Sequence, residues 1–235
     1  MMVPGGWNPI SAPLDHLIAP PRTVSETCAL LVLLHGRGAD AHDLLPLANE
    51  LGREDLLVVS PQAPYALPGP FGIGYAWYDM HDIGDPDPVT FEPSLARLRE
   101  FIDEVVAGYP VDADRVFLLG FSQGAVMSLA TASTDPRRLA GVVALSGYLP
   151  ESVVCAEGGR LDDLPVFIGH GNADPLIPVT EGHKARDVLI AKGADVTYRE
   201  YSVAHRIAPE ELNDIRGWLN ARLDAAPPRE PSGRG

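Results

Sequence analysis

Short apolar runs alternate with longer amphipathic stretches along the chain. The five most apolar runs are CALLVLLHG at 28–36, LLVVSP at 56–61, RVFLLG at 115–120, GVVALSG at 141–147 and PVFIGHG at 165–171. Continuous apolar runs of this length indicate strands that are buried on both faces of a sheet. A sixth run, VTYREY at 196–201, is more polar and predicts a strand nearer an edge.

Helices are predicted between these strands. The candidate segments are residues 41–51, 93–107, 123–132, 179–192 and 209–223. In the second of them Leu95, Leu98, Ile102 and Val106 recur at helical spacing, which gives that helix one apolar face. Alternation of strands and helices is typical of an α/β fold with a mostly parallel central sheet and helices on both faces.

The chain length fits one domain, because 235 residues bury a sizeable core and two domains would each be small. We expect this domain to cover residues 1–224, with the first ten or so loosely held. The segment from 225 to 235, AAPPREPSGRG, has almost no apolar content and is expected to be disordered. Residues 62–92 form a Pro- and Gly-rich connection that is longer than most loops, and such connections are commonly functional.

Composition and charge exclude several classes of function. A formal charge of −14 disfavours binding to nucleic acid or to an anionic membrane. The longest apolar run is too short to span a bilayer, and the N-terminal segment lacks the pattern of a secretory signal, so a cytoplasmic location is expected. Cys28 and Cys155 are then expected to be reduced thiols. The sequence allows a homodimer but does not predict the oligomeric state.

The strongest chemical signal is the segment Gly120-Phe121-Ser122-Gln123-Gly124, a GxSxG motif. It lies directly after a predicted strand and directly before a predicted helix, which is the context in which this motif presents a nucleophilic serine. The glycines allow the sharp turn that holds the hydroxyl clear of the sheet. We expect Ser122 to be the nucleophile; the alternative is a glycine-rich turn with an incidental N-cap serine.

A serine hydroxyl needs a base to remove its proton, and an acid to hold that base. In enzymes with this motif the acid and then the histidine follow the serine along the chain. His205 follows the sixth predicted strand and precedes the last helix, where the base is expected. His183 falls inside a predicted helix and is expected on the surface, whereas His170, at the end of a strand, is a rival for a supporting role.

Asp174 is the candidate acid, because it lies in a short turn after the strand PVFIGHG and immediately before Pro175. Asp162 and Asp163 precede that strand and therefore lie at its opposite end. The alternative for Asp174 is an Asx turn without a catalytic role, and for His205 it is an ordinary loop histidine.

The segment from 35 to 38, His-Gly-Arg-Gly, follows the first predicted strand, where such enzymes place a main-chain amide for the oxyanion. The amides of Arg37 and Gln123 are therefore the expected donors of an oxyanion hole. We expect His35 to be a structural histidine that packs this loop, since one base is enough for catalysis.

These motifs resemble those of a known family. The segments that carry the resemblance are LLHGRGAD, SPQAP, AWYDM, GFSQGAVMSLA, ALSGYLP, GHGNADPLIP and the AH of SVAHRI, between about residues 29 and 222. In order and spacing they resemble the phospholipase/carboxylesterase family of α/β-hydrolases, which includes bacterial carboxylesterases and acyl-protein thioesterases.

The resemblance implies hydrolysis of esters or thioesters without a metal or cofactor. It implies a triad of Ser122, Asp174 and His205, oxyanion donors at Arg37 and Gln123, and an acyl groove lined by Tyr75, Trp77 and Tyr78. Arg37 stands where the thioesterases usually have an apolar residue, which favours short- to medium-chain esters as the small-molecule substrate. The rival interpretations are an acyl-protein thioesterase or lysophospholipase-like hydrolase, a serine peptidase, and a non-catalytic binding module on the same scaffold.

Overall fold

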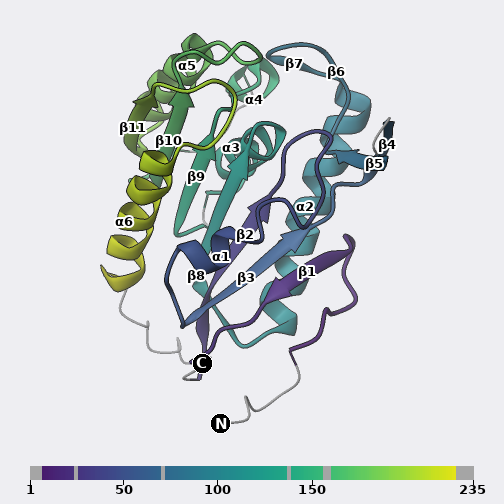
Figure 1. Ribbon diagram of the computed structural model, residues 1–235, viewed down its shortest axis with the longest axis vertical. Coiled ribbons are helices and arrows are strands. Elements are labelled where there is room, and N and C mark those ends of the chain that lie inside the picture. Colours follow the sequence, from purple (N-terminus) through teal and green to yellow (C-terminus); the bar gives the residue numbers. More distant parts are fainter. Residues whose placement is uncertain (1–6, 24–25, 70–71, 137–138, 156–159, 226–235) are drawn as a thin grey trace.

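A seven-stranded sheet runs through the centre of the computed structural model (Figure 1). The structure describes residues 7–23, 26–69, 72–136, 139–155 (of Cys155, only the main chain) and 160–225. The strands of the sheet are β1 (His16–Ala19), β2 (Cys28–Leu34), β3 (Leu56–Pro61), β8 (Val111–Phe121), β9 (Gly141–Leu145), β10 (Pro165–Gly171) and β11 (Asp195–Tyr201). Their order is β1-β3-β2-β8-β9-β10-β11; β1 is antiparallel to β3, and the other neighbours are parallel.

The predicted strands all belong to this sheet. The five apolar runs form its interior, and the more polar run forms β11 at one edge, as its composition indicated. Strand β1 at the other edge was missed. It has four residues, of which only His16 is buried, and such a short, polar segment has no distinctive pattern of its own.

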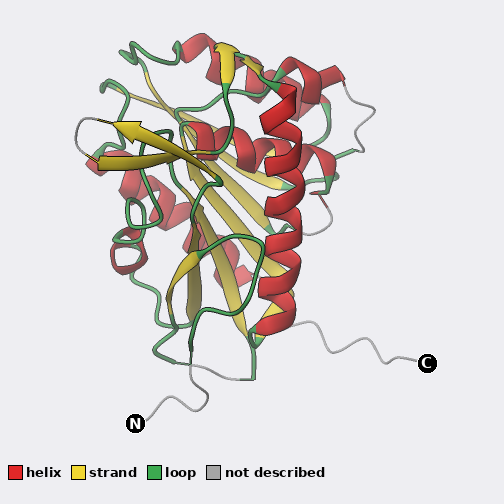
Figure 2. Ribbon diagram, turned by 90° about the vertical axis from the view of Figure 1, so that its right-hand side faces the viewer, coloured by secondary structure: helices red, strands yellow, loops and turns green. Residues whose placement is uncertain are grey.

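Helices cover both faces of the sheet (Figure 2). Alternate residues of β2 point to opposite faces: Leu30 and Val32 pack in one apolar cluster with α2 (Pro88–Gly108), α3 (Gln123–Thr134) and α5 (Val179–Ala191), whereas Leu31 packs in the other with α6 (Pro209–Ala225). Two short helices, α1 (Leu47–Glu50) and α4 (Glu151–Cys155), complete the set. This arrangement confirms the predicted α/β fold.

Two predicted helices have different boundaries in the structure. The helix expected over 41–51 is reduced to α1, because Pro46 disfavours helical geometry in the residue before it. Helix α2 begins earlier than expected, at Pro88 instead of Pro93. The Asp87 side chain caps it by accepting a hydrogen bond from the Val89 amide at 2.9 Å, and a proline is well suited to the first helical position.

The long connection 62–92 contains regular structure that the sequence did not reveal. A hairpin is formed by β4 (Tyr65–Gly69) and β5 (Gly72–Ala76), and a second small pair by β6 (Met80–Asp82) and β7 (Asp85–Pro86). Both lie beyond the carboxyl ends of the central strands (Figure 1). The connection therefore folds over the edge of the sheet where the candidate site residues were expected.

The ends of the chain are described only in part. Of the N-terminal segment expected to be loosely held, residues 1–6 lie outside the described residues; within 7–10, Trp7 stacks on Tyr109 with ring centroids 5.7 Å apart, and the Ile10 amide donates to the Tyr109 hydroxyl at 3.2 Å. Ala225 ends α6, and the rest of the predicted disordered segment lies outside the described residues.

Cys28 is a free, buried thiol, and the prediction for the Cys155 thiol lies outside the described side chains. Within the described ranges, no helix is both long and apolar enough to cross a bilayer.

Helix α3 starts in direct contact with the carboxyl end of β2. A Cβ atom at Gly124, in its first turn, would collide with the carbonyl oxygen of Leu34, and one at Gly120 would collide with the carbonyl of Gly124. Only glycine permits this approach of helix to strand. The glycines of the GxSxG motif therefore fix where the helix begins.

We expect Gly124→Ala to lower the free energy of unfolding by at least about 2 kcal/mol, because the added methyl group forces main chain apart. Gly217→Ala is the matched control: it also lies in a helix, but a Cβ there meets nothing within 4 Å. That change should raise stability by about 0.5–1 kcal/mol. Urea denaturation of both variants measures the difference, and equal effects would contradict the packing argument.

Glu211 is a buried carboxyl group near the start of α6. Its side chain accepts a hydrogen bond from the Ala208 amide at 3.1 Å, while its Oε1 has no partner among the described residues. Burial raises the pKa of Glu211 to about 7, from an ordinary value of 4.5. The folded state therefore binds this proton more tightly than the unfolded state, and ionisation lowers stability as the pH rises from 4.5 through 7.

Glu211→Gln retains an acceptor for the Ala208 amide and removes the ionisation. The variant should match wild type near pH 4.5 and be more stable by about 3 kcal/mol at pH 8. Thermal melts across this pH range measure the difference. Glu210→Gln removes the same charge at an exposed neighbouring position, so an identical pH profile for the two variants would disprove the assignment.

Candidate active site

Ser122 occupies the turn between β8 and α3 in a strained backbone conformation. Its φ of 55° and ψ of −119° are rare for a residue with a side chain, and such strain persists only where surrounding contacts impose it. The Ser122 amide donates to the Leu145 carbonyl at 2.9 Å, and its carbonyl accepts from the Val126 amide at 3.2 Å. The turn thus holds the partly exposed hydroxyl above the carboxyl end of the sheet.

His205 lies within hydrogen-bond distance of that hydroxyl. Its Nε2 is 3.0 Å from Ser122 Oγ, and its Nδ1 is 2.7 Å from Asp174 Oδ2. Because the carboxylate accepts from Nδ1, the ring presents Nε2 to the serine as a proton acceptor. The Phe121 ring packs against the imidazole with centroids 4.8 Å apart and restricts its orientation.

The register of the last two strands brings Asp174 and His205 together. Gly171, at the end of β10, pairs with Tyr201, at the end of β11, so the loops that follow start side by side. The Asn172 amide donates to the Tyr201 carbonyl at 2.8 Å, and this bond ties the loops together. Sequence positions separated by 83 residues, Ser122 and His205, meet because parallel strands present their carboxyl ends at one edge.

Asp174 also forms the Asx turn that was the alternative to a functional role. Its Oδ1 accepts from the amides of Leu176 at 2.9 Å and Ile177 at 3.0 Å, while its Oδ2 faces His205. Burial by itself would raise the pKa of this carboxyl, but the hydrogen bonds from Ile177, His205 and Leu176 outweigh it and lower the pKa. Asp174 therefore remains a carboxylate beside the imidazole.

The other histidines take structural positions. His170 is fully buried, its Nε2 lies 2.9 Å from the Ile177 carbonyl, and its nearest approach to Asp174 is 3.9 Å, so it packs behind the acid. Burial lowers the pKa of His170. His183 is on the surface of α5, where its Nε2 contacts Glu200 at 2.7 Å. Neither of them touches Ser122 among the contacts of the described residues.

His35 is buried within the loop after β2. Its Nδ1 lies 2.8 Å from the Gly36 carbonyl, and its Nε2 accepts from the Ala63 amide at 3.1 Å. Both ring nitrogens are thereby satisfied in the neutral form, and burial lowers the pKa of the ring. This geometry agrees with the structural role expected for His35.

The main-chain amides of Arg37 and Gln123 belong to segments that lie beside Ser122. Gln123 is the first residue of α3, so its amide has no intrahelical acceptor and lies at the positive end of the helix dipole. Arg37 follows β2 next to Gly36, where a Cβ atom would lie 3.3 Å from the Cβ of Ser122. Among the described residues neither amide has an acceptor, which leaves both free to receive hydrogen bonds from an oxyanion.

The segment 75–79 does not line the site in the way the resemblance implied. Trp77 and Tyr78 have side chains with 0% exposure, so they are not accessible to a substrate in this structure. The Trp77 indole donates to the His35 carbonyl at 2.9 Å, and the Tyr78 ring packs on Phe91. Only Tyr75 of the three is partly exposed. The predicted groove-lining role of Trp77 and Tyr78 is therefore corrected to a supporting role behind the site.

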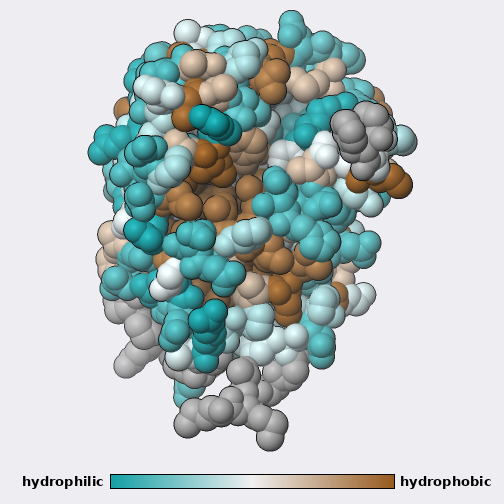
Figure 3. Space-filling view, viewed as in Figure 1, coloured by the Kyte–Doolittle hydropathy of each residue, from teal (hydrophilic) through white to brown (hydrophobic). Residues whose placement is uncertain are grey.

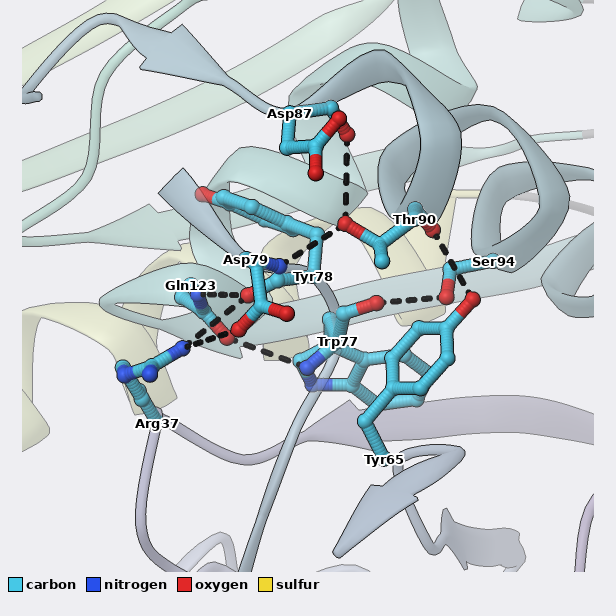
Figure 4. A network of polar contacts seen from close by, with 9 residues as sticks. All are labelled: Arg37, Tyr65, Trp77, Tyr78, Asp79, Asp87, Thr90, Ser94 and Gln123. Atoms are coloured by element: carbon cyan, nitrogen blue, oxygen red, sulfur yellow. Dashed lines mark hydrogen bonds and ion pairs between the residues drawn. The ribbon is translucent and has the colours of Figure 1, made fainter. Parts of the chain in front are cut away.

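Sequence reasoning missed the side chains that hold this segment. The Gln123 side chain accepts from the Trp77 amide at 3.0 Å and donates to the Tyr78 carbonyl at 2.8 Å (Figure 4). Ser94 of α2 donates to the Trp77 carbonyl. A polar residue on the buried face of α2 was the one available signal, since Ser94 falls beside the apolar Leu95 and Leu98 in the sequence.

Apolar side chains gather in a hollow in the middle of the molecular face shown in Figure 3. The partly buried residues Phe121 and Ile207 pack against the apolar cluster that includes α6, and Phe121 contacts the His205 ring. Leu176, two residues after Asp174 in the chain, is 61% exposed. Within the described ranges, no group of three or more His, Cys, Asp or Glu side chains has a metal-binding arrangement.

Comparisons with known proteins agree with this geometry. The sequence model of the family described as Phospholipase/Carboxylesterase matches residues 18–223. An acyl-protein thioesterase 1 from Yarrowia lipolytica is 32% identical over 213 residues, covering 83% of this chain and 92% of the relative. A crystal structure of esterase PE8 superposes with a TM-score of 0.79 at 29% identity, covering 88% of this chain and 98% of that one.

A carboxylesterase from Bacillus cereus has the same fold, with a TM-score of 0.78 at 23% identity and coverage of 89% of this chain and 94% of the other. The family match extends from β1 to the last turns of α6 and includes Ser122, Asp174 and His205. The chain therefore belongs to the phospholipase/carboxylesterase family of α/β-hydrolases.

Proposed function

We propose that the protein is a serine carboxylesterase that hydrolyses short- to medium-chain carboxylic esters through an acyl-enzyme on Ser122. The observation that carries this proposal is the continuous chain of hydrogen bonds from Asp174 through His205 to Ser122, at 2.7 and 3.0 Å. These distances suit transfer of the serine proton to the imidazole.

The proposed reaction has two displacements. Ser122 Oγ attacks the ester carbonyl carbon while His205 Nε2 takes the serine proton, and a tetrahedral oxyanion forms. The carbon–oxygen bond to the leaving alcohol then breaks, and the alcohol departs with the proton from Nε2. Water attacks the acyl-enzyme in the same way and restores Ser122 as the carboxylic acid leaves. Asp174, whose pKa is lowered by its hydrogen bonds in spite of burial, stabilises the imidazolium in both steps.

The amides of Arg37 and Gln123 are the proposed donors to the oxyanion. They belong to two different elements beside Ser122, the loop after β2 and the first turn of α3, which supports this assignment. Donors that are already in place stabilise the developing charge without reorganisation during the reaction. The oxyanion hole requires no metal ion to serve this purpose.

The acyl half of the substrate is proposed to bind along the apolar surface that reaches the imidazole through Phe121, with Tyr75 as a further partly exposed contact. Arg37, which is exposed at the mouth of the site, limits apolar contact there. This supports a preference for short to medium acyl chains over long lipid chains.

An acyl-protein thioesterase activity is the second candidate, supported by the thioesterase relative that is 32% identical and by the 61% exposure of Leu176 beside the acid. Turnover of a matched pair, the same acyl group as an oxygen ester and as a thioester, separates the two proposals. A preference for the thioester in kcat/KM would favour the second candidate.

Ser122→Ala should lower kcat by about four to six orders of magnitude, because the nucleophile is lost while the fold is retained. The measurement is hydrolysis of p-nitrophenyl esters from acetate to palmitate, with highest kcat/KM expected at short to medium chain length. Ser152→Ala, at an exposed serine of α4, is the control and should retain wild-type turnover.

Near-normal turnover by Ser122→Ala would refute the proposed mechanism. If wild type hydrolyses no ester and a fluorophosphonate probe fails to label Ser122 in the folded protein, a non-catalytic binding module replaces the esterase proposal.

A further inference from the structure

One main-chain carbonyl links the two residues that provide the proposed oxyanion amides. The Tyr78 carbonyl oxygen accepts from Arg37 Nη1 at 3.1 Å and from Gln123 Nε2 at 2.8 Å (Figure 4). A carbonyl oxygen has two lone pairs, so both bonds are compatible with one acceptor. The side chains of Arg37 and Gln123 thus meet at a common point, the Tyr78 carbonyl oxygen.

The Tyr78 carbonyl is held in place by the packing around it. The rings of Trp77 and Tyr78 are fully buried, and the Tyr78 hydroxyl pairs with that of Tyr148 at 3.0 Å. On the neighbouring peptide, the Asp79 amide donates to Thr90 Oγ1 of α2 at 2.9 Å. Movement of the Tyr78 carbonyl would disturb buried packing, and packed interiors resist such displacement.

The loop that carries Arg37 depends on the same segment. The Gly38 amide donates to the Tyr75 carbonyl at 2.8 Å, and the Trp77 indole donates to the His35 carbonyl at 2.9 Å. These two bonds hold the main chain on either side of Arg37. A further main-chain bond runs from the Tyr75 amide to the Ala39 carbonyl at 2.9 Å. The Arg37 side chain adds a tether at the residue whose amide is the proposed oxyanion donor.

Asp79 orients the Arg37 side chain. Its carboxylate lies 3.5 Å from Arg37 Nη1, the same nitrogen that donates to the Tyr78 carbonyl. The side chains of Arg37 and Asp79 are 39% and 59% exposed, so the ion pair adds little to overall stability. Its contribution is to geometry, since it holds the guanidinium where it meets the fixed carbonyl.

We propose that the Arg37 side chain is a positioning residue that sets the location of its own amide relative to the Gln123 amide, and so tunes the oxyanion hole. The proposal rests on the proposed esterase function. The alternative is that the guanidinium binds a polar substrate at the mouth of the site. Positioning of the oxyanion hole affects the chemical step and therefore kcat, whereas uniform substrate binding affects KM.

The test is Arg37→Met, which keeps an unbranched side chain but removes the donor and the charge. Complete loss of one oxyanion donor lowers kcat by about 10²–10³-fold, so a misplaced donor should lower it by about 10-fold. We expect KM to change by less than about 2-fold. Arg37→Lys, which retains a charged donor, should recover most of the loss. Arg160→Met removes an exposed arginine with its own ion pair to Asp162 and should not alter kcat.

A raised KM with unchanged kcat would overturn the proposal in favour of substrate binding, and wild-type kinetics for Arg37→Met would overturn it outright. The melting temperature should shift by less than about 2 °C, since the side chain is partly exposed; a large shift would instead indicate a structural role. Asp79→Asn should lower kcat less than Arg37→Met does, and the double variant should match Arg37→Met, because both changes affect one tether.

The rate of labelling by a fluorophosphonate separates this proposal from the esterase proposal. The probe reacts with Ser122 and places its phosphoryl oxygen where an oxyanion would lie, so the test does not depend on knowing the substrate. If wild type is labelled but hydrolyses no ester, slower labelling of Arg37→Met still supports positioning, and equal labelling rejects it. If wild type is not labelled at all, both proposals fail.

Discussion

The contact between the first turn of α3 and the end of β2 is the constraint on which the site depends. Because Gly124 lies against the Leu34 carbonyl without a Cβ, the helix can begin immediately after β8. Because α3 begins there, Ser122 adopts its strained turn, and the Gln123 amide lies at the N-terminus of the helix, next to Ser122. It also brings the loop after β2 to within contact of the serine. Ser122 and the two proposed oxyanion amides are consequently brought close together by main-chain packing, and the Arg37 side chain is proposed to refine the position of its own amide.

His205, the proposed general base, is placed by the register of the parallel strands. Ser122, Asp174 and His205 follow β8, β10 and β11, and the parallel register aligns the ends of these strands at one edge of the sheet. Asp174 uses one oxygen to build its own turn and the other to hold the imidazole. An Asx turn and a catalytic acid are therefore compatible in a single carboxylate. The lowered pKa of Asp174 follows from the same hydrogen bonds, which outweigh its burial.

Segment 75–79 ties the loop after β2 to α3 and α2. It makes hydrogen bonds with that loop, with Gln123 of α3 and with Ser94 of α2, and it buries two large aromatic rings. The Arg37–Asp79 ion pair lies at the exposed margin of this network, and Arg37 joins the network by donating to the Tyr78 carbonyl at 3.1 Å. In the proposed arrangement Arg37 supports the oxyanion loop through polar contacts that an apolar side chain at this position would not make.

The sequence by itself determined the interior strands and the α/β class, and it singled out Ser122, Asp174 and His205 as the candidate residues that the structure brings together, because apolar runs, a GxSxG motif and chain order are local or one-dimensional signals. It did not determine β1, the hairpins within 62–92 or the buried positions of Trp77 and Tyr78. Aromatic residues in a Pro- and Gly-rich segment fit a groove wall and a buried support equally well. Only the tertiary structure decided between them, since burial depends on the packing of α2 and α3, and hydrogen-bond partners such as Arg37 and Tyr78 lie 41 residues apart.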